Sequence, residues 1–472
     1  MWIAIVAAAF YIMGILSSIN AVMTARTSQG AIAWVVSLIT FPFIAVPAYW
    51  IFGNSRFNGY VKARHSSHTK VQNGLAQTLE GLEPYHLKRS EISSAGAAAE
   101  KLADLPFLRG NNVELLIDGN ATFESILDGI DSAVSYILFQ FYIVHDDEIG
   151  RKMKDHLIAK VQDGIKVYFL YDEIGSLDLP SAYTDDLRDA GAEIYSFHTQ
   201  KGRGNRFQLN FRNHRKIVVV DGKAAWIGGH NIGDEYLGRD PNVGNWRDTH
   251  MKITGPAAIA AQVSFVEDWH WSTGDFLLGI TWIPTPVTEG NTHILIVPSG
   301  PADELETATL MFMHSINSAK ERIWIATPYF VPDDAILAAL QLAGLRGVDV
   351  RILVPDKADN LLVNLSFYTY LDDASLTGVR FFRYTDGFLH EKVMLIDHEA
   401  AAVGTANFDN RSFRLNFEIT GLIIDPLFAA EIDEMFIADF ARAIEMTKSD
   451  MDDHSFWFRL ATRLARLTSP VQ

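Results

Sequence analysis

The chain has 472 residues, of which 48% are hydrophobic and 21% are charged, and it contains no cysteine. This composition is typical of a folded protein of two or three domains and excludes a disordered chain or a fibre. The lack of cysteine excludes disulfides, thiolate metal sites and cysteine nucleophiles. The formal net charge of −17 argues against nonspecific nucleic-acid binding, so we predict no nucleic-acid partner.

The N-terminal region is apolar and has no acidic residue before Glu80. Two uncharged blocks, 2–23 and 31–52, would each be about 33 Å long as helices, which is enough to cross a bilayer. We therefore predict a two-helix transmembrane hairpin within residues 1–53. A signal peptide for the first block and a buried core helix for the second are the alternatives.

Basic residues give the orientation of this hairpin. Its connecting loop contains only Arg26, whereas four basic residues follow it, namely Arg56, Lys62, Arg64 and Lys70. By the positive-inside rule, everything after the hairpin faces the cytoplasm. The prediction is a multi-pass, integral membrane protein in which a basic polar linker, 54–105, leads to cytoplasmic domains.

The chain ends in a short amphipathic segment, 451–472. Its apolar side chains would share one helical face, namely Phe456, Trp457, Leu460, Leu464 and Leu467. Its arginines would form a stripe on another face, namely Arg459, Arg463 and Arg466. This combination favours a helix in an anionic membrane interface, and an ordinary packed helix is the alternative.

The region between these ends contains an internal repeat. The string NHRKIVVVD (213–221) recurs as LHEKVMLID (389–397), and both have the spacing HxKxxxxD. A turn of small residues that ends in asparagine follows each copy, at Asn231 and at Asn407. Two copies with the same trailing turn are not accidental, so the repeat is a strong signal of two homologous domains.

The surroundings of the motif repeat as well. An apolar run ending at Tyr142 corresponds to one ending at Tyr329, and a helical segment follows each, at 151–163 and 335–346. A glycine and a nearly all-apolar strand come next in both copies. This order is typical of a sheet that helices cover on both faces.

We therefore predict an α/β protein with two homologous domains, 106–285 and 286–450. Within the motifs, 217–220 and 393–396 are predicted to be short buried strands. The Pro-rich segment 283–287 marks the domain junction.

The repeated residues suit phosphoryl transfer. A His and a Lys two positions apart point to the same side of an extended strand, so facing domains can bring two of each together. One imidazole can attack phosphorus while the other donates a proton to the leaving alkoxide. The lysines Lys216 and Lys392 and the two Asn amides can stabilise the charge that develops on oxygen. We predict that His214 and His390 are catalytic.

A metal site built on the two histidines is the rival hypothesis. The motif supplies no third His or carboxylate close to them, and each His is accompanied by a lysine that would repel a cation. We therefore predict chemistry without a metal or any other cofactor.

The paired motifs resemble those of the phospholipase D superfamily, and the longer strings around them resemble the bacterial cardiolipin synthases within it. These strings are NHRKIVVVDG (213–222), GGHNIGDEY (228–236), WRDTH (246–250), ATPYFVPD (326–333), FLHEKVMLID (388–397) and GTANFDNRSFRLNFE (404–418). The resemblance covers essentially the whole chain. It implies two α/β/α sandwich domains that share one active site, and a place in the bacterial inner membrane.

The resemblance also implies a reaction, in which two phosphatidylglycerols give cardiolipin and glycerol through a phosphatidyl-histidine. It implies that His214 is the nucleophile and His390 the acid and base, whereas the symmetry of the repeat alone leaves this order open. A downstream acid would orient each His, and by position these acids are Asp248 and Glu418.

The motif aspartates Asp221 and Asp397 complete the predicted catalytic set, with the role of structural salt-bridge partners. Gly229 stands where the family typically has a serine, so it supplies no hydroxyl.

Four further residues are predicted to bind the substrate, namely Arg212, Arg215, Tyr142 and Tyr329. The basic loop 201–212 could hold a second anionic headgroup or could simply be solvated. A hydrolase, a transferase for another alcohol, a nuclease and a non-catalytic membrane scaffold are the alternative functions. The sequence does not decide between a monomer and a homo-oligomer.

Overall fold

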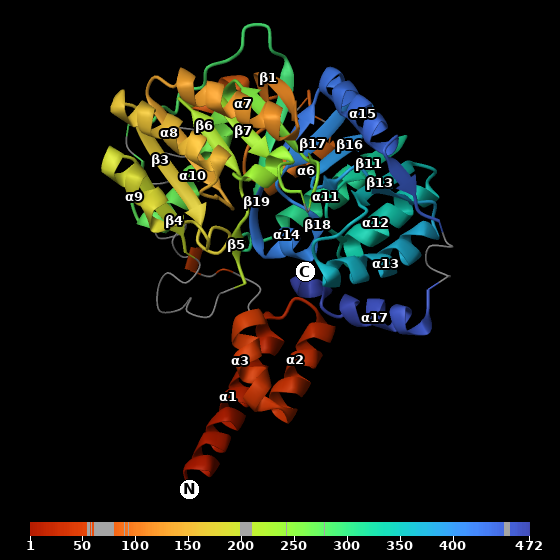
Figure 1. Cartoon of the computed structure of the whole chain (residues 1–472). Coiled ribbons are helices and arrows are strands. Elements are labelled where there is room, and N and C mark those ends of the chain that lie inside the picture. The colour runs from red at the N-terminus through yellow and green to blue at the C-terminus, as the bar shows by residue number, and fades with distance from the viewer. Residues whose placement is uncertain are drawn as a thin grey trace.

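The structure is a computed structural model of the chain. It describes residues 1–53, 57, 59–60, 80–88, 90–92, 94–198, 210–241, 243–277, 279–447 and 454–472. Two α/β halves lie side by side, and a group of N-terminal helices extends from one side of them (Figure 1). Most of the basic loop 201–212, including Lys201–Arg206, lies outside the described residues.

One β-sheet runs through both halves, and its strand order is symmetric about its centre except for the outermost strand β20, which has no counterpart among the described residues of the first half. The central strands β1 (Leu108–Ile117) and β10 (Thr292–Ser299) pair antiparallel and so join the halves. Outward from β1 come β9 (Thr249–Thr254), β7 (Ala224–Gly228), β6 (Ile217–Val220), β2 (Tyr136–Phe141), β3 (Lys166–Asp172) and β4 (Glu193–Phe197). Outward from β10 come β19 (Asn416–Ile424), β17 (Ala400–Gly404), β16 (Val393–Ile396), β11 (Arg322–Ala326), β13 (Asp349–Pro355), β14 (Arg380–Tyr384) and β20 (Ala443–Glu445).

Helices cover both faces of this sheet. The first half has α7 (Asp118–Ser132), α8 (Glu148–Gln162), α9 (Ser181–Ala190), η2 (Asp234–Leu237) and α10 (Pro256–Thr273). The second half has α11 (Thr307–Ser318), α12 (Asp334–Leu345), α13 (Leu361–Ser375), α14 (Asn410–Arg414) and α15 (Pro426–Phe440). Side chains of β2 alternate between two cores: Ile137 and Phe139 pack with α7, α8 and α9, whereas Tyr136 and Leu138 pack with α10. The predicted α/β architecture is confirmed.

The elements predicted around the repeat are confirmed closely. The two predicted motif strands are β6 and β16, with the predicted bounds. The helical segments 151–163 and 335–346 correspond to α8 and α12. Each apolar strand after them, β3 and β13, pairs parallel with the strand before the helix. Two βαβ units therefore lie in equivalent places.

The predicted second spanning helix, 31–52, is wrong. The structure has α1 (Trp2–Thr24) followed by two short helices, α2 (Ser28–Thr40) and α3 (Pro42–Phe52). The chain bends at Phe41, and Pro42 takes the first position of α3, where its missing N–H costs nothing. At 1.5 Å per residue these helices are about 20 and 16 Å long, too short to span about 30 Å of hydrocarbon. Among the described residues, α1 is the single helix long and apolar enough to cross a membrane.

The short helices pack against the half of α1 nearest the α/β halves. The Tyr49 hydroxyl donates to Asn20 Oδ1 at 2.7 Å, and Trp50 Nε1 donates to Ser17 Oγ at 3.3 Å. A Cβ on Gly14 would lie 2.5 Å from the Leu38 carbonyl oxygen, so this glycine permits the close helix contact. The remaining N-terminal turns of α1 extend beyond the bend (Figure 1).

The α1–α2 loop also lies on an unexpected side. Arg26 in this loop forms an ion pair with Glu306 of the second half, with 2.8 Å between Nε and Oε1. The loop therefore lies on the side of the α/β halves, contrary to the predicted hairpin, which placed it across the membrane from them.

The predicted polar linker contributes to the core, which corrects the expectation for 54–105. Phe57, Tyr60 and Leu82 are buried, and the Phe57 ring stacks on Phe211 and contacts Phe417 of the second half. The described part also includes η1 (Glu83–Tyr85) and α6 (Ser94–Ala103). The segment thus helps to join the halves.

Candidate active site

Two short strands lead into the motif histidines and pair with strands of the opposite half. β5 (Arg212–Asn213), just before His214, pairs parallel with β19 of the second half. β15 (Phe388–Leu389), just before His390, pairs parallel with β8 (Trp246–Arg247) of the first half. The short strands β12 (Phe330–Val331) and β18 (Phe408–Asp409) pair within the second half.

Backbone hydrogen bonds between the halves extend from these short strands to the motif histidines themselves. The His214 N–H donates to the Phe417 carbonyl at 2.9 Å, and the His390 N–H donates to the Arg247 carbonyl at 2.7 Å. The residues that follow these carbonyls are the two predicted orienting acids. Each imidazole is therefore held beside a carboxylate of the opposite half.

The side chains also pair across the boundary between the halves. His214 Nδ1 lies 2.9 Å from Glu418 Oε2, and His390 Nδ1 lies 2.7 Å from Asp248 Oδ2. The acids predicted by position thus contact the imidazoles, and the structure adds that each pair crosses between the halves. A neutral imidazole that donates Nδ1–H to a carboxylate keeps its Nε2 lone pair free. The geometry therefore leaves one nucleophilic or basic nitrogen on each side of a shared site.

Burial sets the charges of these groups. It lowers the pKa of His214, partly offset by Glu418, and it lowers the pKa of His390 to about 3, with a further contribution from Lys392. Burial alone would raise the pKa of Asp248 and Glu418, yet nearby cations and imidazoles lower both. In this structure the two imidazoles are therefore uncharged at neutral pH and the two carboxylates are ionised.

The lysines lie close to the histidine backbones. Lys216 Nζ donates to the His214 carbonyl at 2.7 Å, and Lys392 Nζ donates to the His390 carbonyl and lies 2.9 Å from His390 Nδ1. Burial lowers the pKa of both, that of Lys392 to about 8. The charge of each lysine also lowers the pKa of the histidine in the other half. All four groups therefore belong to one site.

The two asparagines occupy equivalent places with different partners. Asn231 Oδ1 accepts from the Ile143 N–H at 3.1 Å, and its Nδ2 donates to the Tyr236 hydroxyl at 2.8 Å. Asn407 Oδ1 is buried and has no hydrogen-bond partner within the described parts of the chain. Asn231 is thus fixed by its neighbours, whereas Asn407 retains an unused acceptor.

Gly229 has a steric role that its lack of a hydroxyl did not suggest. A Cβ at this position would lie 2.0 Å from Asp248 Oδ1, so a side chain would displace the carboxylate. At the equivalent place, the Thr405 hydroxyl donates to Glu418 Oε2 at 2.5 Å. Gly229 therefore makes room for Asp248, whereas Thr405 binds Glu418 through its hydroxyl.

The motif aspartates lie at the far ends of β6 and β16, away from the imidazoles. Asp221 accepts from the backbone N–H groups of 134–136, at 2.8 to 2.9 Å, and Asp397 accepts from those of 320–322, at 2.8 to 3.1 Å. Both have positive φ, 53° and 51°. They tie the start of one strand to the end of another, which corrects the predicted role of salt-bridge partners.

Arg215 is a second correction, because it was predicted to bind substrate. Its side chain is buried, with Nη1 3.0 Å from Asp268 Oδ1 and Nε donating to the Glu418 carbonyl at 3.0 Å. Glu391 occupies the same motif position in the second half and pairs with Arg247 at 2.9 Å. These central motif residues brace the strand that carries the opposite acid.

Of the other predicted substrate-binding residues, Arg212 and Tyr142 lie near His214. Arg212 lies close enough to Arg411 of the second half to lower its pKa, after burial as the larger cause. The Tyr142 ring lies edge-on to His214, with 5.0 Å between centroids, and beneath Lys216. The Tyr329 hydroxyl donates to Asp359 at 2.6 Å.

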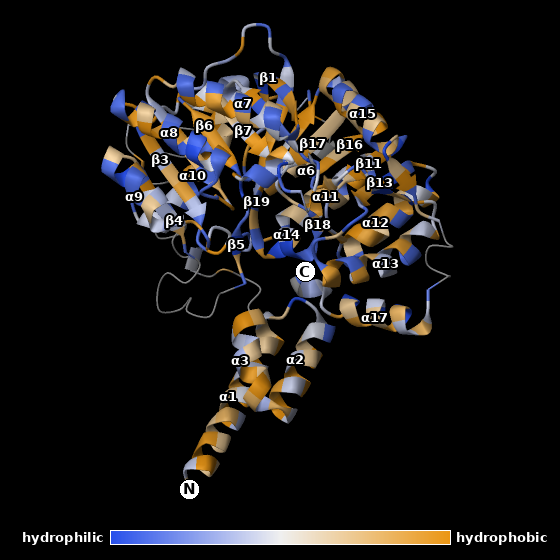
Figure 2. Ribbon diagram, viewed as in Figure 1, coloured by the Kyte–Doolittle hydropathy of each residue, from blue (hydrophilic) through white to orange (hydrophobic). Residues whose placement is uncertain are grey.

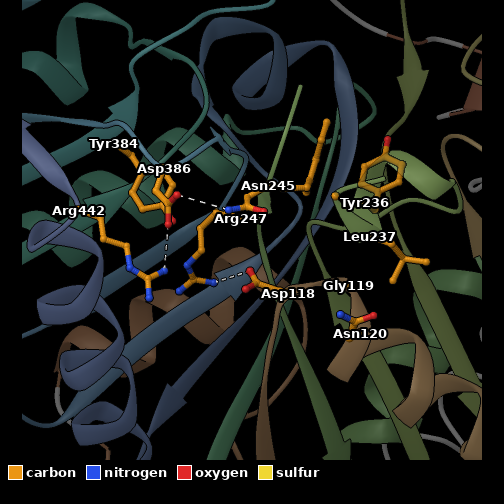
Figure 3. A pocket seen from close by; sticks show the side chains of 12 residues that line it. Asp118, Gly119, Asn120, Tyr236, Leu237, Asn245, Arg247, Tyr384, Asp386 and Arg442 are labelled. Atoms are coloured by element: carbon orange, nitrogen blue, oxygen red, sulfur yellow. Dashed lines mark hydrogen bonds and ion pairs between the residues drawn. The ribbon is translucent and has the colours of Figure 1, made fainter. Parts of the chain in front are cut away.

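A polar pocket of about 260 Å³ lies at the boundary between the halves (Figure 3). Arg247 and Asp118 form an ion pair on one side of it, and Asp386 interacts with Arg442 and Asn245 on the other. Trp246 lines this pocket, and its ring lies 5.1 Å from that of His390. One aromatic ring, that of Trp246, therefore separates the pocket from the His390 imidazole.

Comparison with known proteins identifies the family of this site. A family profile described as "Cardiolipin synthase, PLD-like domain" matches residues 126–260 and 312–440. Cardiolipin synthase A of Pseudomonas putida (strain W619) is 46% identical over 466 residues, covering 98% of this chain and 96% of that protein. Cardiolipin synthase A of Pseudomonas fluorescens (strain SBW25) is 45% identical over 469 residues, covering 98% and 97%.

The chain belongs to the cardiolipin synthase family. Its fold is shared with phosphatidylserine synthase of Haemophilus influenzae Rd KW20, with a TM-score of 0.60 and 17% identity over 80% of this chain and 100% of that one. The resemblance to phospholipase D proteins inferred from the motifs is confirmed.

Some neighbours of the cardiolipin synthase motifs were missed from the sequence. Arg411 lies in the quoted string GTANFDNRSFRLNFE, yet nothing in the repeat marks it, because its counterpart is not an arginine at the same offset. Trp246 and Arg247 precede Asp248 and are brought to His390 by the β8–β15 pairing. A search for cations shortly before the orienting acids would have found both arginines.

Proposed function

We propose that this protein is a phosphatidyltransferase that converts two phosphatidylglycerols into cardiolipin and glycerol. The observation that carries the proposal is that each imidazole pairs through Nδ1 with a carboxylate of the opposite half. This leaves His214 Nε2 and His390 Nε2 available to one phosphodiester. The whole-length similarity to cardiolipin synthases supports this substrate.

In the first step, His214 Nε2 attacks the phosphorus of one phosphatidylglycerol. The negative charge of the bound phosphodiester, together with Asp248, raises the pKa of His390 in the substrate complex, so its Nε2 is protonated there. The bond from phosphorus to the glycerol oxygen breaks, and the leaving oxygen takes this proton from His390 Nε2. The products are glycerol and a phosphatidyl-His214. Glu418 stabilises the positive charge that the substituted imidazole acquires.

In the second step, neutral His390 accepts the proton of the terminal hydroxyl of a second phosphatidylglycerol. The hydroxyl oxygen attacks phosphorus, the bond to His214 breaks, and cardiolipin forms. Lys216 and Lys392 stabilise the charge that develops on the non-bridging oxygens. Asp221 and Asp397 support the strands rather than the chemistry.

The pKa values favour the reverse assignment of the two imidazoles. His390 has the more depressed pKa, about 3, because Lys392 adds to its burial, and a group that resists protonation suits the nucleophile. The family resemblance favours His214. Rapid acid quenching with radiolabelled substrate, followed by peptide mapping, identifies which imidazole carries the phosphatidyl group.

Anion binding is the proposed role of Arg212 together with Arg411. Two guanidinium groups from opposite halves lie close together beside Tyr142, and a phosphate relieves their mutual repulsion. We assign them the phosphate of the second lipid. Tyr142 and Tyr329 would bound the headgroup site as predicted, whereas Arg215 has no such role.

The proposed location is the inner membrane of a bacterium, with the catalytic halves in the cytoplasm. α1 would cross the bilayer, and α2 and α3 would enter it to about half its depth and return, since Phe43 beyond the bend contacts Phe10 in the middle part of α1. Arg26 and the four basic residues after α3 then all lie on the cytoplasmic side.

A hydrolase or a transferase for another alcohol shares the first step, so the acceptor distinguishes them. Purified enzyme with labelled phosphatidylglycerol as sole lipid should give cardiolipin and glycerol in equal amounts. Phosphatidic acid as the dominant product would support a hydrolase. A product formed only after serine or another alcohol is added would support a different transferase. The variant His214→Ala provides the blank.

A further inference from the structure

The C-terminal helix α17 (Phe456–Arg466) is fixed to the second half by one face. Thr462 and Ala465 are buried on this face, and the Phe458 ring contacts that of Tyr368 on α13. Arg466 pairs with Asp373 at 2.6 Å, and the Tyr370 hydroxyl donates to Ser469 in the short η3 (Ser469–Val471) that follows. The helix is therefore a rigid part of the catalytic body.

The opposite face is apolar and exposed. Its side chains span about 100° of the helix at 100° per residue, and they lie roughly opposite the docked face. The exposed fractions are 64% for Phe456, 74% for Trp457, 38% for Leu460, 56% for Leu464 and 75% for Leu467. Five large apolar side chains gathered on one exposed helix face indicate a binding surface.

The flank of this face is basic. Arg459 and Arg463 are exposed beside the apolar face, about two turns and one turn, respectively, before the helix ends at Arg466. Aromatic and leucine side chains beside arginines are the pattern of helices that lie in an anionic membrane surface. A protein partner would require a complementary acidic groove, whereas an anionic bilayer satisfies both faces at once.

The position of α17 agrees with that partner. α17 lies below α13, on the side of the catalytic halves from which α1, α2 and α3 extend, near the level where these helices begin (Figures 1 and 2). We call α1, α2 and α3 together the membrane anchor. Arg26, in the loop between α1 and α2, ties the anchor to the second half, which also carries α17, through its ion pair with Glu306. A bilayer around the anchor would therefore reach α17.

We propose that α17 lies in the anionic surface of the same membrane that holds α1, with its apolar face below the headgroups. The helix and the anchor then form two separated attachments, which fix the tilt of the catalytic halves against the lipid. This inference goes beyond the proposed reaction and does not depend on which acceptor the enzyme uses.

The absence of cysteine allows a direct test on the full-length protein. The variants Trp457→Cys and Leu464→Cys are labelled with an environment-sensitive dye and reconstituted in phosphatidylglycerol vesicles that contain doxyl-labelled lipid. Because interfacial helices insert about 5–10 Å, roughly half or more of the dye emission should be quenched. Leu427→Cys is the matched control, since Leu427 is 79% exposed at the start of α15, away from the anchor.

Equal, weak quenching at positions 457, 464 and 427 would overturn the proposal. Dye emission that depends on protein concentration, with no quenching by doxyl lipid, would also overturn it and would indicate a second copy of the chain as the partner. The variant Arg459→Gln/Arg463→Gln should lower the fraction of α17 bound to the bilayer several-fold, and the quenching should fall with it. The reason is that each basic residue adds about fivefold to binding at an anionic surface.

An activity measurement tests the consequence, and this arm alone rests on the proposed function. Phe456→Ser/Trp457→Ser/Leu464→Ser should lower turnover of vesicle substrate roughly tenfold while turnover in detergent micelles is unchanged, because micelles impose no fixed tilt. An equal loss in vesicles and micelles would contradict the role of α17. Absence of cardiolipin from the unaltered enzyme in both media would contradict the proposed function and leave the quenching result intact.

Discussion

The two halves of the active site share one backbone plan but surround their carboxylates differently. Glu418 receives hydrogen bonds from His214, Thr405, Ser412 and Asn416, whereas Asp248 receives them from His390 and the Thr249 N–H, with Gly229 against it. Lys392 also lies nearer its imidazole nitrogen than Lys216 does. The repeat thus fixes positions, and residues outside it differentiate the two imidazoles.

Removing either imidazole should have the largest effect on the rate of cardiolipin synthesis. His214→Ala and His390→Ala should each lower cardiolipin synthesis about 10⁴-fold or more, because each removes a group that bonds to phosphorus or moves a proton. A lipid substrate with a good leaving group separates them: His390→Ala should still form the labelled enzyme, and His214→Ala should not. The opposite outcome would exchange their roles.

The two carboxylates that pair across the halves should have the next largest effect. Glu418→Gln and Asp248→Asn should each lower the rate about 10³-fold, since the imidazole loses its orientation and the stabilisation of its charge. In spectra of ¹⁵N-labelled histidine, Glu418→Gln should shift His214 and leave His390 unchanged, and Asp248→Asn should do the reverse. A shift confined to the histidine in the same half as the substituted acid would refute the pairing of each imidazole with the carboxylate of the opposite half.

The neighbours of the acids should give smaller and unequal losses. Gly229→Ala should lower the rate roughly 10²-fold, because the new Cβ displaces the Asp248 carboxylate. Thr405→Val removes one of several donors to Glu418 and should cost about fivefold. Steady-state rates of both variants, with circular dichroism as the folding control, test this order. Equal losses would mean that Gly229 has no steric role.

The pH dependence should show the smallest effect near neutral pH, and its alkaline limb reports on Lys392. Its pKa of about 8 lies below the usual lysine value because of burial, so its ammonium is present below pH 8 and lost above it. The kcat/KM value should therefore fall about tenfold per unit above pH 8. In Lys392→Arg the alkaline fall should disappear, because a guanidinium stays protonated. An unchanged fall would assign it to another group.

The sequence predicted the local elements well because their causes are local. The apolar runs of β6 and β16, and the helices α8 and α12, follow from hydrophobic patterning, and the motif marks them twice. The acids Asp248 and Glu418 were found through the resemblance. Their pairing across the halves was not, since it depends on β5 and β15 pairing with strands of the opposite half.

The wrong predictions share a physical reason, which is that composition does not reveal packing. Residues 31–52 are apolar enough to span a bilayer, but Pro42 ends one helix and begins another. Arg215 has the charge of a phosphate ligand, yet Asp268 neutralises it in the core. Phe57 and Tyr60 stand in a basic, polar stretch and still contribute to the core.

The central claim is that both imidazoles serve a single phosphorus atom. The most direct test counts the phosphatidyl groups bound to rapidly quenched wild-type enzyme supplied with ³²P-labelled phosphatidylglycerol. The account predicts at most one group per chain, located on a single histidine. Two groups per chain, one on His214 and one on His390, would show two independent sites and contradict it.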